Sequence, residues 1–185
     1  MFVIPKISEQ EARNIFSNKK RFSPSKLKKI PHSPKKLEII YLPFYLFDII
    51  VKKEAREKNE THSLEQKVTL SVDGLLGHSV FYAVDDLAVE SNREPMVCDF
   101  SLSPSEAEKI VLSEYRVLLL EHGLRTHSSP QAEEISGIKK IFYPFWIGYF
   151  RKRNGYDFKA LDAVSGEIQG IKMRKVFMRA FRQMA

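Results

Sequence analysis

The sequence predicts an α+β protein made of two repeated units, each with a helix packed on an antiparallel sheet. The observations behind this prediction are three blocks of sequence that occur twice in the same order. Residues 7–15 resemble residues 102–110, residues 40–46 resemble residues 141–147, and Asp73 followed by Gly77 recurs as Asp162 followed by Gly166. Matches in one order indicate two copies of one supersecondary unit. We expect the units to span residues 1–97 and 98–185, with their sheets joined or packed together.

The helix that opens each unit is predicted from a capping box. Ser8 and Ser103 are each followed three residues later by a glutamate, Glu11 and Glu106. The hydroxyl accepts from an early helical N–H while the carboxylate reaches back to the cap. We expect a short first helix and a longer second helix that stops at Gly123, because glycine is common just after a helix end.

Three further segments are interpreted from their composition: two polar segments and one basic segment. Residues 19–36 and 124–136 are rich in polar residues, and we interpret both as loops. Residues 171–185 place apolar residues at helical spacing with Lys and Arg between them, which predicts a basic amphipathic helix.

A long aromatic strand follows in each unit, at about residues 37–52 and 138–153. These segments are dense in Ile, Tyr, Phe and Val, which suit a packed sheet. Pro43 and Pro144 lie inside them, and we expect each proline at a sheet edge or a bulge because it has no N–H for a ladder. Residues 53–66 are charged, and we interpret them as a flexible excursion between strands.

Each unit then closes with a hairpin. Residues 68–72 return through residues 80–84, and residues 158–161 return through Ile168. The connecting turns contain Asp73 and Asp162, which we interpret as turn formers rather than as a catalytic pair of carboxylates.

At these residues the sequence resembles the PepSY domain. The resemblance is carried by the Ser-x-x-Glu-Ala start of a helix, by the aromatic strand, and by the hairpin Leu-Asp-Ala-Val-Ser-Gly-Glu-Ile at residues 161–168. It is clearest over residues 102–170, and the first copy departs at residues 73–77, where a leucine precedes the glycine. The resemblance implies a cystatin-like fold, one helix on an antiparallel sheet. It also implies a protein that binds or inhibits other proteins rather than catalysing a reaction.

The composition is that of an ordinary globular protein. The chain has 185 residues, 43% of them hydrophobic, which is enough to bury a core. No apolar run approaches the roughly 20 residues that span a bilayer, and the first residues lack the pattern of a secretory signal. The single cysteine, Cys98, excludes an internal disulfide framework and fits a reducing compartment. We therefore expect a cytoplasmic protein without a transmembrane segment.

The residues that usually carry chemistry are scattered. The histidines are His32, His62, His78, His122 and His127. They form no pair with metal-ligand spacing, so we predict no metal site, and we expect no cofactor. Cys98 has no motif around it and is expected to be buried. We expect no enzymatic activity; the alternative is an enzyme that uses His122 or His127 with a nearby carboxylate.

The aromatic residues of the long strands are the candidates for a binding surface, because Tyr and Trp are enriched at interfaces. Both faces of each strand carry apolar side chains, so one face takes the helix and the other needs the second unit, a partner or a ligand. The candidate binding residues are Tyr45, Phe47, Trp146 and Phe150. The alternative is that they pack between the two units. We expect a non-catalytic protein-binding or regulatory module, with a protein partner or a second copy in a homodimer.

The uneven charge supports a second hypothesis. The net charge is +7, with ten Lys and Arg against three acids in residues 1–40 and nine against three in residues 141–185. An electrostatic binder would use residues 19–36 and 171–185 to attract nucleic acid or an anionic membrane surface. The basic candidates in the loop are Lys19, Lys20, Arg21, Lys26, Lys28, Lys29, Lys35 and Lys36. The alternatives are a solvated loop and a helix that covers its own domain.

Overall fold

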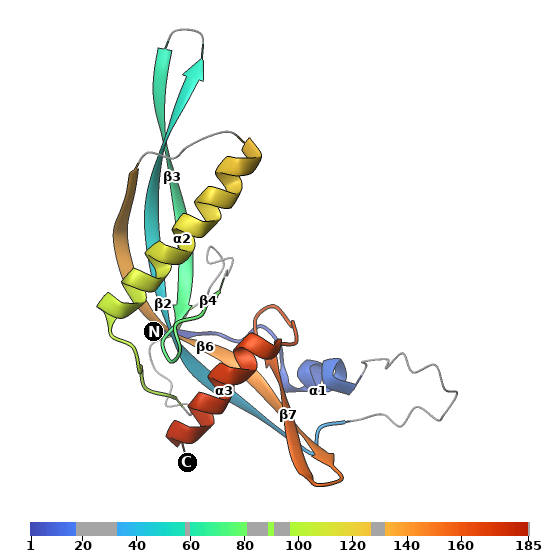
Figure 1. Ribbon diagram of the computed structural model, residues 1–185. Helices are drawn as coiled ribbons and strands as arrows, with labels where there is room; N and C mark the ends of the chain where they lie inside the picture. The colour runs from blue at the N-terminus through green and yellow to red at the C-terminus, as the bar shows by residue number, and fades with distance from the viewer. Residues whose placement is uncertain (18–32, 58–59, 81–88, 91–96, 127–131, 185) are drawn as a thin grey trace. The chain divides into compact units, whose positions relative to one another are not determined.

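The computed structural model describes residues 1–17, 33–57, 60–80, 89–90, 97–126 and 132–184. Of residues 51–57, 60–66, 80, 89–90, 118–126 and 132–133 it describes the backbone alone. The helices are α1 (Glu9–Ser17), α2 (Pro104–Thr126) and α3 (Ile171–Met184) (Figure 1). The strands are β1 (Phe2–Val3), β2 (Lys36–Glu57), β3 (Glu60–Asp73), β4 (Ser79–Val80), β5 (Val89–Glu90), β6 (Ala132–Lys152) and β7 (Gly155–Asp162). The predicted α+β class is confirmed. Within the described residues, no helix is both long enough and apolar enough to span a membrane.

The strands form a mixed sheet. The order of hydrogen-bonded neighbours is β4-β3-β2-β6-β1-β5, and β7 also pairs with β6. β1 runs parallel to β6, whereas β2–β3 and β6–β7 are antiparallel hairpins.

The chain divides into two compact units, and each unit takes segments from both predicted halves. Unit 1 consists of Met1–Leu42, Ala88–Cys98 and Phe142–Ala185, and unit 2 consists of Pro43–Leu87 and Asp99–Ile141. These units do not coincide with the predicted segments 1–97 and 98–185. The reason is that β2 and β6 each contribute residues to both units.

In unit 1, helices cover both faces of the β6–β7 hairpin. Phe16 of α1 packs edge-on against Phe150, with ring centroids 5.9 Å apart. Phe177 of α3 packs edge-on against Phe145, with ring centroids 5.1 Å apart. Residues an odd number of positions apart in a strand point to opposite faces, so α1 and α3 lie on opposite sides of the hairpin. The remaining core on the α1 side contains Ala12, Leu161, Ile7, Ile15, Trp146 and Ile168.

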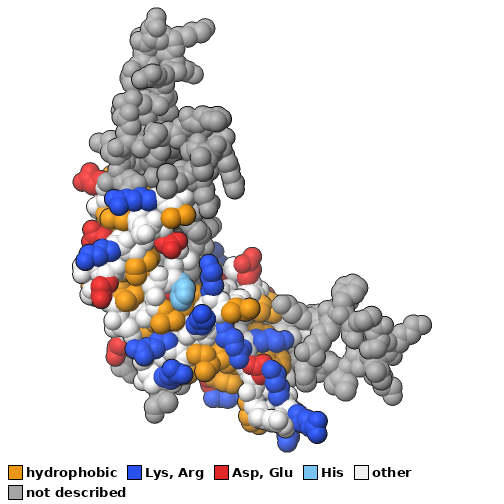
Figure 2. Space-filling view, in the orientation of Figure 1, with side chains coloured by type: hydrophobic (Ala, Val, Ile, Leu, Met, Phe, Trp, Pro, Cys, Tyr) orange, Lys and Arg blue, Asp and Glu red, His pale blue; other side chains and the backbone are white. Residues whose placement is uncertain are grey.

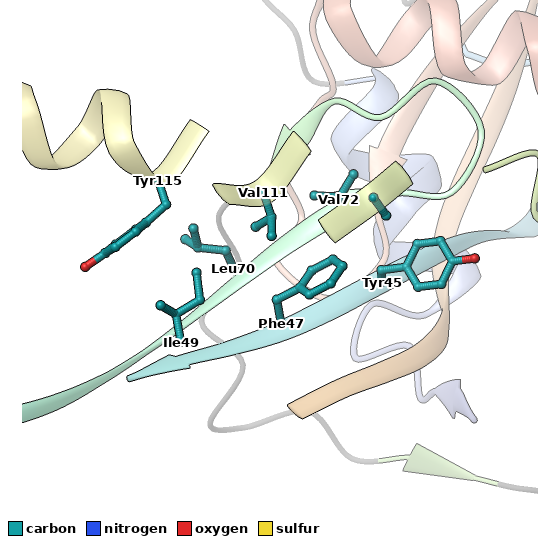
Figure 3. Close-up of a cluster of buried hydrophobic side chains, with 8 residues drawn as sticks. Tyr45, Phe47, Ile49, Leu70, Val72, Val111 and Tyr115 are labelled. Atoms are coloured by element: carbon teal, nitrogen blue, oxygen red, sulfur yellow. The ribbon is translucent and has the colours of Figure 1, made fainter. Parts of the chain in front are cut away.

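In unit 2, α2 covers one face of the β2–β3 hairpin. Its buried residues Ala107, Val111 and Tyr115 are spaced four apart, so they lie on one side of the helix. Figure 3 shows side chains of the hairpin directed toward this side of the helix. The hairpin residues in this cluster are Tyr45, Phe47, Ile49, Leu70 and Val72. Each large apolar side chain buried in this way stabilises the fold by about 1.5–3 kcal/mol.

The predicted capping boxes are present at both helices. The Ser8 N–H donates to Glu11 Oε2 at 2.8 Å, and the Glu11 N–H donates to Ser8 Oγ at 3.3 Å. The same two hydrogen bonds, at the same lengths, join Ser103 and Glu106. The short first helix and the helix over residues 171–184 are confirmed as well.

The interpretation of residues 53–66 as a flexible excursion is wrong. β2 and β3 pair without interruption from Phe44↔Asp73 to Glu57↔Glu60. The ladder joins backbone groups, so charged side chains do not prevent it when the strand pair already has a register.

The second helix and second strand also differ from prediction at their ends. α2 continues past Gly123 to Thr126, because one glycine costs a helix only about 1 kcal/mol. β6 begins at Ala132 rather than near residue 138, which shortens the predicted loop of residues 124–136. The predicted loop of residues 19–32 lies outside the described residues.

Pro43 and Pro144 lie in the interior strands β2 and β6 rather than at a sheet edge. The Pro43 carbonyl accepts from Gly74 N–H at 2.7 Å, and the Pro144 carbonyl accepts from Ala163 N–H at 3.1 Å. The amide nitrogen of a strand residue points to the same side as its carbonyl. Each proline nitrogen therefore faces the turn of a hairpin, one residue beyond the ladder, where no strand N–H is required.

Candidate binding surface

The carboxylate of Asp73 is used by the backbone of its own turn. Its Oδ1 accepts from the N–H groups of Leu75 and Leu76 at 3.0 and 2.7 Å. Its Oδ2 accepts from the His78 N–H at 2.6 Å, and His78 Nδ1 lies 3.2 Å from the same oxygen. The side chain is completely buried. The prediction that Asp73 forms a turn is confirmed.

Asp162 occupies the equivalent place in the other hairpin. Its Oδ1 accepts from the N–H groups of Val164 and Ser165 at 2.8 and 3.0 Å. The Tyr143 hydroxyl donates to the same carboxylate at 3.0 Å. Burial raises the pKa of Tyr143 far above its ordinary value, and the negative charge of Asp162 adds to this. Both groups are held in structural roles.

Two of the four candidate aromatic residues make matched hydrogen bonds. The Tyr45 hydroxyl donates to the Leu102 carbonyl at 2.7 Å, just before α2 begins. The Trp146 Nε1–H donates to the Ile7 carbonyl at 2.8 Å, just before α1 begins. Each aromatic therefore fixes the start of the helix that covers its own strand.

Burial of the four aromatic candidates favours packing over an exposed binding surface. Tyr45, Phe47 and Phe150 are buried, with exposed fractions of 1%, 0% and 5%, and Trp146 is half-buried. Tyr45 and Phe47 lie beneath α2, and Phe150 and Trp146 lie beneath α1. Each pair is thus covered by a helix from the other predicted half of the chain.

Of the candidate basic loop, Lys35 and Lys36 belong to the described residues, and the six others lie outside them. The Lys35 N–H donates to the Tyr149 carbonyl at 2.7 Å. Lys36 forms an ion pair with Glu38 and lies 5.6 Å from the centroid of the Tyr149 ring. Partial burial alone would raise the pKa of Glu38, but its bonds to Lys36 and Tyr149 lower it. Lys36 is therefore already paired within unit 1.

An exposed basic surface is formed by α3 and the β6–β7 hairpin. One side of α3 is buried through Met173, Val176, Phe177 and Ala180. The other side exposes cations, and Figure 2 shows Lys and Arg side chains gathered over this region, with hydrophobic side chains among them. We call this set the α3 surface; its exposed residues are Lys172, Lys175, Met178, Arg179, Arg182, Arg151, Arg153 and Tyr156. The helical part was predicted, whereas the hairpin tip was missed although Arg151-Lys152-Arg153 is a visible run of charge.

The acid beside this surface is already neutralised. Asp157 accepts from Lys152 at 2.5 Å and from Arg174 at 2.7 Å. These two cations, with Lys152 the stronger, lower the pKa of Asp157 to about 2. Within the described residues, no ion pair joins an acid to the exposed α3 cations Lys172, Lys175, Arg179 or Arg182. The α3 surface is therefore cationic.

A small cavity lies between β7 and the first turn of α3. Its volume is about 170 Å³, and its lining includes Phe158, Ala160, Gly170, Ile171, Arg174 and Phe177. Small-molecule sites typically enclose about 300–1,000 Å³, so this cavity has room for one or two side chains rather than a cofactor.

No family model, curated protein or solved structure matches this chain.

The described residues bring no reactive groups together. No group of three or more His, Cys, Asp or Glu side chains that could hold a metal ion occurs among them. Cys98 is buried, and His78 serves the Asp73 turn. The side chains of His122 and His127 lie outside the described residues, so the alternative that uses them stays a prediction. Chemically, the described part of the chain offers a cationic and partly apolar surface beside a strand edge.

Proposed function

We propose that this chain is a non-catalytic protein-binding module built from two PepSY-like repeats, which binds its partner through the α3 surface. The observation that carries the non-catalytic part is the use of both matched carboxylates, Asp73 and Asp162, by turn N–H groups. A carboxylate that already accepts from its own turn is a poor general base.

The repeat is supported by contacts that recur at matched positions. Tyr45 and Trp146 bond the residue before the capping serine, and the two capping boxes have the same geometry. The turn residues match as well: Gly74 accepts from Ser101 and Leu102, and Ala163 accepts from Lys6 and Ile7. In this proposal each repeat supplies a helix that packs on the hairpin of the other repeat. A cystatin-like unit is then completed only by both halves of the chain.

Binding through the α3 surface is supported by its composition. Met178 is 43% exposed and Tyr156 is 72% exposed, amid exposed Lys and Arg. Aromatic residues, Met and Arg are enriched at protein interfaces.

The proposal is tested by photo-crosslinking in living cells. A photoreactive phenylalanine analogue replaces Met178 in one variant and Gln10, exposed on α1, in a matched control. We expect the Met178 variant to form a covalent adduct with one protein, identified by mass spectrometry, and the Gln10 variant to form none. Equal adducts from both positions, or no protein adduct from Met178, would contradict the proposal.

A second candidate function, electrostatic binding of nucleic acid or an anionic membrane, is favoured by one observation. Four α3 cations form no ion pair with an acid within the described residues: Lys172, Lys175, Arg179 and Arg182. Binding of this kind weakens steeply between about 0.05 and 0.2 M salt because counterions are released. Titration of the full chain with a labelled oligonucleotide and with anionic vesicles at these salt concentrations tests it. Affinity that does not change with salt rejects it.

A further inference from the structure

Four exposed residues follow one line along α3: Ile171, Lys175, Met178 and Arg182. They are four, three and four positions apart, so each is a neighbour of the next on the helix surface. The side opposite this line is buried through Met173, Val176, Phe177 and Ala180. We call the exposed line the α3 seam.

The α3 seam has the spacing by which two helices pair. Alternate steps of four and three residues are the a and d positions of a heptad, which face a partner helix in a coiled coil. Ile171 and Met178, seven residues apart, take the d position, and Lys175 and Arg182 take the a position. The apolar d residues are 81% and 43% exposed. α3 therefore presents the apolar and basic half of a helix pair.

The charges along the seam determine which partner fits. Lys172 and Arg179 take the e position, beside the basic a residues. Within the part of the chain that the structure describes, no ion pair joins an acid to any of these four cations. A partner that brings carboxylates to the a and e positions therefore meets cations that form no such pair.

The acid nearest to α3 lies on the other flank of the seam. Arg174 takes the g position, and its guanidinium donates to the Phe158 carbonyl at 2.9 Å and to Asp157 at 2.7 Å. In a heptad, e and g lie on opposite flanks of the a and d line. Carboxylates placed on the e flank are thus separated by the seam from Asp157, whose charge is already matched by Lys152 and Arg174.

The exposed apolar residues favour a protein helix over the other anionic partners. A helix that binds a membrane surface buries its apolar face among the lipids, but the apolar face of α3 is buried in its own unit. A phosphate backbone would pair with the cations and leave Ile171 and Met178 in contact with water. An amphipathic acidic helix supplies carboxylates and apolar side chains together. The 14 residues of α3 offer it two heptads, a length of about 21 Å.

We propose that α3 binds an acidic amphipathic helix of a partner protein along the α3 seam. This rests on the protein-binding function proposed above and specifies the partner's chemistry. Apolar residues of the partner pack on Ile171 and Met178, and its glutamates lie beside Lys175, Arg182 and the e residues.

The test is fluorescence anisotropy with the full chain and a labelled alanine-based peptide of about 21 residues, long enough to form a helix. The peptide carries leucine at every d position and glutamate at every a, e and g position. One matched probe replaces glutamate with glutamine, and a second keeps the composition but distributes leucine and glutamate around the whole helix. We expect the first peptide to bind about ten-fold more tightly than either probe, because several exposed ion pairs and the apolar contacts act together.

Two variants of the chain test the seam itself, and both exchange exposed residues for glutamine, whose helix propensity is similar. Met178→Gln removes an apolar contact and no charge, and should weaken the first peptide about five-fold. Lys175→Gln with Arg182→Gln should weaken it about five-fold as well. The control Lys6→Gln with Lys109→Gln removes two exposed cations outside α3 and should change affinity by less than about two-fold.

Equal binding of the ordered and redistributed peptides would show attraction to charge alone and overturn the proposal. Equal effects of the two double variants, or no effect of Met178→Gln, would overturn it as well. So would binding of duplex DNA or of phosphatidylserine vesicles without binding of the peptide. A protein adduct at Met178 together with any of these results would refute the acidic helix and leave the proposed function standing, whereas the absence of an adduct would refute both.

Discussion

At the scale of single residues, the buried turn aspartates show how a charge is stabilised without an ion pair. Asp162 is 3% exposed, and its charge is met by two backbone N–H groups and the Tyr143 hydroxyl. Hydrogen bonds to a charged group contribute more than neutral ones. Short-range sequence was sufficient to predict this role, because an aspartate four residues before a glycine defines the turn locally. The Tyr143 contact was not predictable, since it joins residues far apart in the chain.

Replacing Asp162 should therefore lower stability according to how many acceptors are lost. Asp162→Ala removes both oxygens and should reduce the free energy of unfolding by about 2–4 kcal/mol, as expected when several donors are left unpaired. Asp162→Asn keeps one acceptor oxygen and should lose less. Urea unfolding measures both, with the exposed Glu167→Gln as control. An unchanged midpoint for Asp162→Ala would show that the turn does not need the carboxylate.

The ion pairs of Asp157 predict how the stability of the fold changes with pH. Its pKa is lowered from 3.8 to about 2 in the folded protein by Lys152 and Arg174. A lowered pKa means that ionised Asp157 stabilises the fold above pH 4 and that this contribution is lost as the pH falls through about 2. Asp157→Asn should thus lower the thermal midpoint slightly at pH 7, and its difference from the parent should shrink toward pH 2. A difference that grew on acidification would contradict the assigned ion pairs.

At the scale of elements, helix starts and turns were predictable because their determinants are local. The capping boxes, the two turns and the α3 stripe each depend on residues within a few positions of one another. The continuation of β2 and β3 beyond residue 52 was not predictable, because their charged residues lack the apolar pattern that marks a strand. The covering of the candidate aromatics also depends on distant helices, and no local pattern identifies which helix covers which strand.

The two turn glycines should respond differently to alanine. Gly77 and Gly166 have φ of 78° and 75°, where an L side chain is strained by about 1–3 kcal/mol. A Cβ at Gly77 would lie 2.5 Å from Ile110 Cδ1, whereas at Gly166 the nearest atom, Ile7 Cδ1, would be 3.5 Å away. Gly77→Ala should therefore destabilise more than Gly166→Ala in urea unfolding. The control Gly137→Ala, without a positive φ and with no heavy atom closer than 3.7 Å, should have little effect. Equal losses at Gly77 and Gly166 would contradict the packing against Ile110.

At the scale of the whole molecule, each hairpin is covered by a helix from the other half of the chain, and this determines what can fold. The β2–β3 hairpin belongs to residues 1–97, but Ala107, Val111 and Tyr115, which cover it, belong to residues 98–185. Likewise Phe16 of the first half covers Phe150 of the second. The sequence predicted the helices and the hairpins but not which helix covers which hairpin, because an apolar stripe on a helix does not identify the strands it packs on.

The two halves of the chain, produced as separate fragments, should thus fold together but not alone. Fragments 1–97 and 98–185 each expose a hairpin face that normally contacts the other half, so neither should be a folded monomer. Mixing them should restore a cooperative thermal transition, followed by circular dichroism, in a 1:1 complex measured by light scattering. A monomeric fragment that unfolds cooperatively by itself would show that its own helix covers its own hairpin.

The order of the segments of the two units along the sequence also determines which unit is synthesised completely first. Every segment of unit 2, Pro43–Leu87 and Asp99–Ile141, is synthesised before Phe142–Ala185. Unit 2 is therefore complete before the end of β6, β7 and α3 have been synthesised. Until then, α1 and the first part of β2 lack the segments of unit 1 that bury them. Those early residues, with Phe16 and Leu37 among them, stay without their native cover until late in synthesis. Chaperones that hold nascent chains would therefore encounter this protein first at its earliest-made segment.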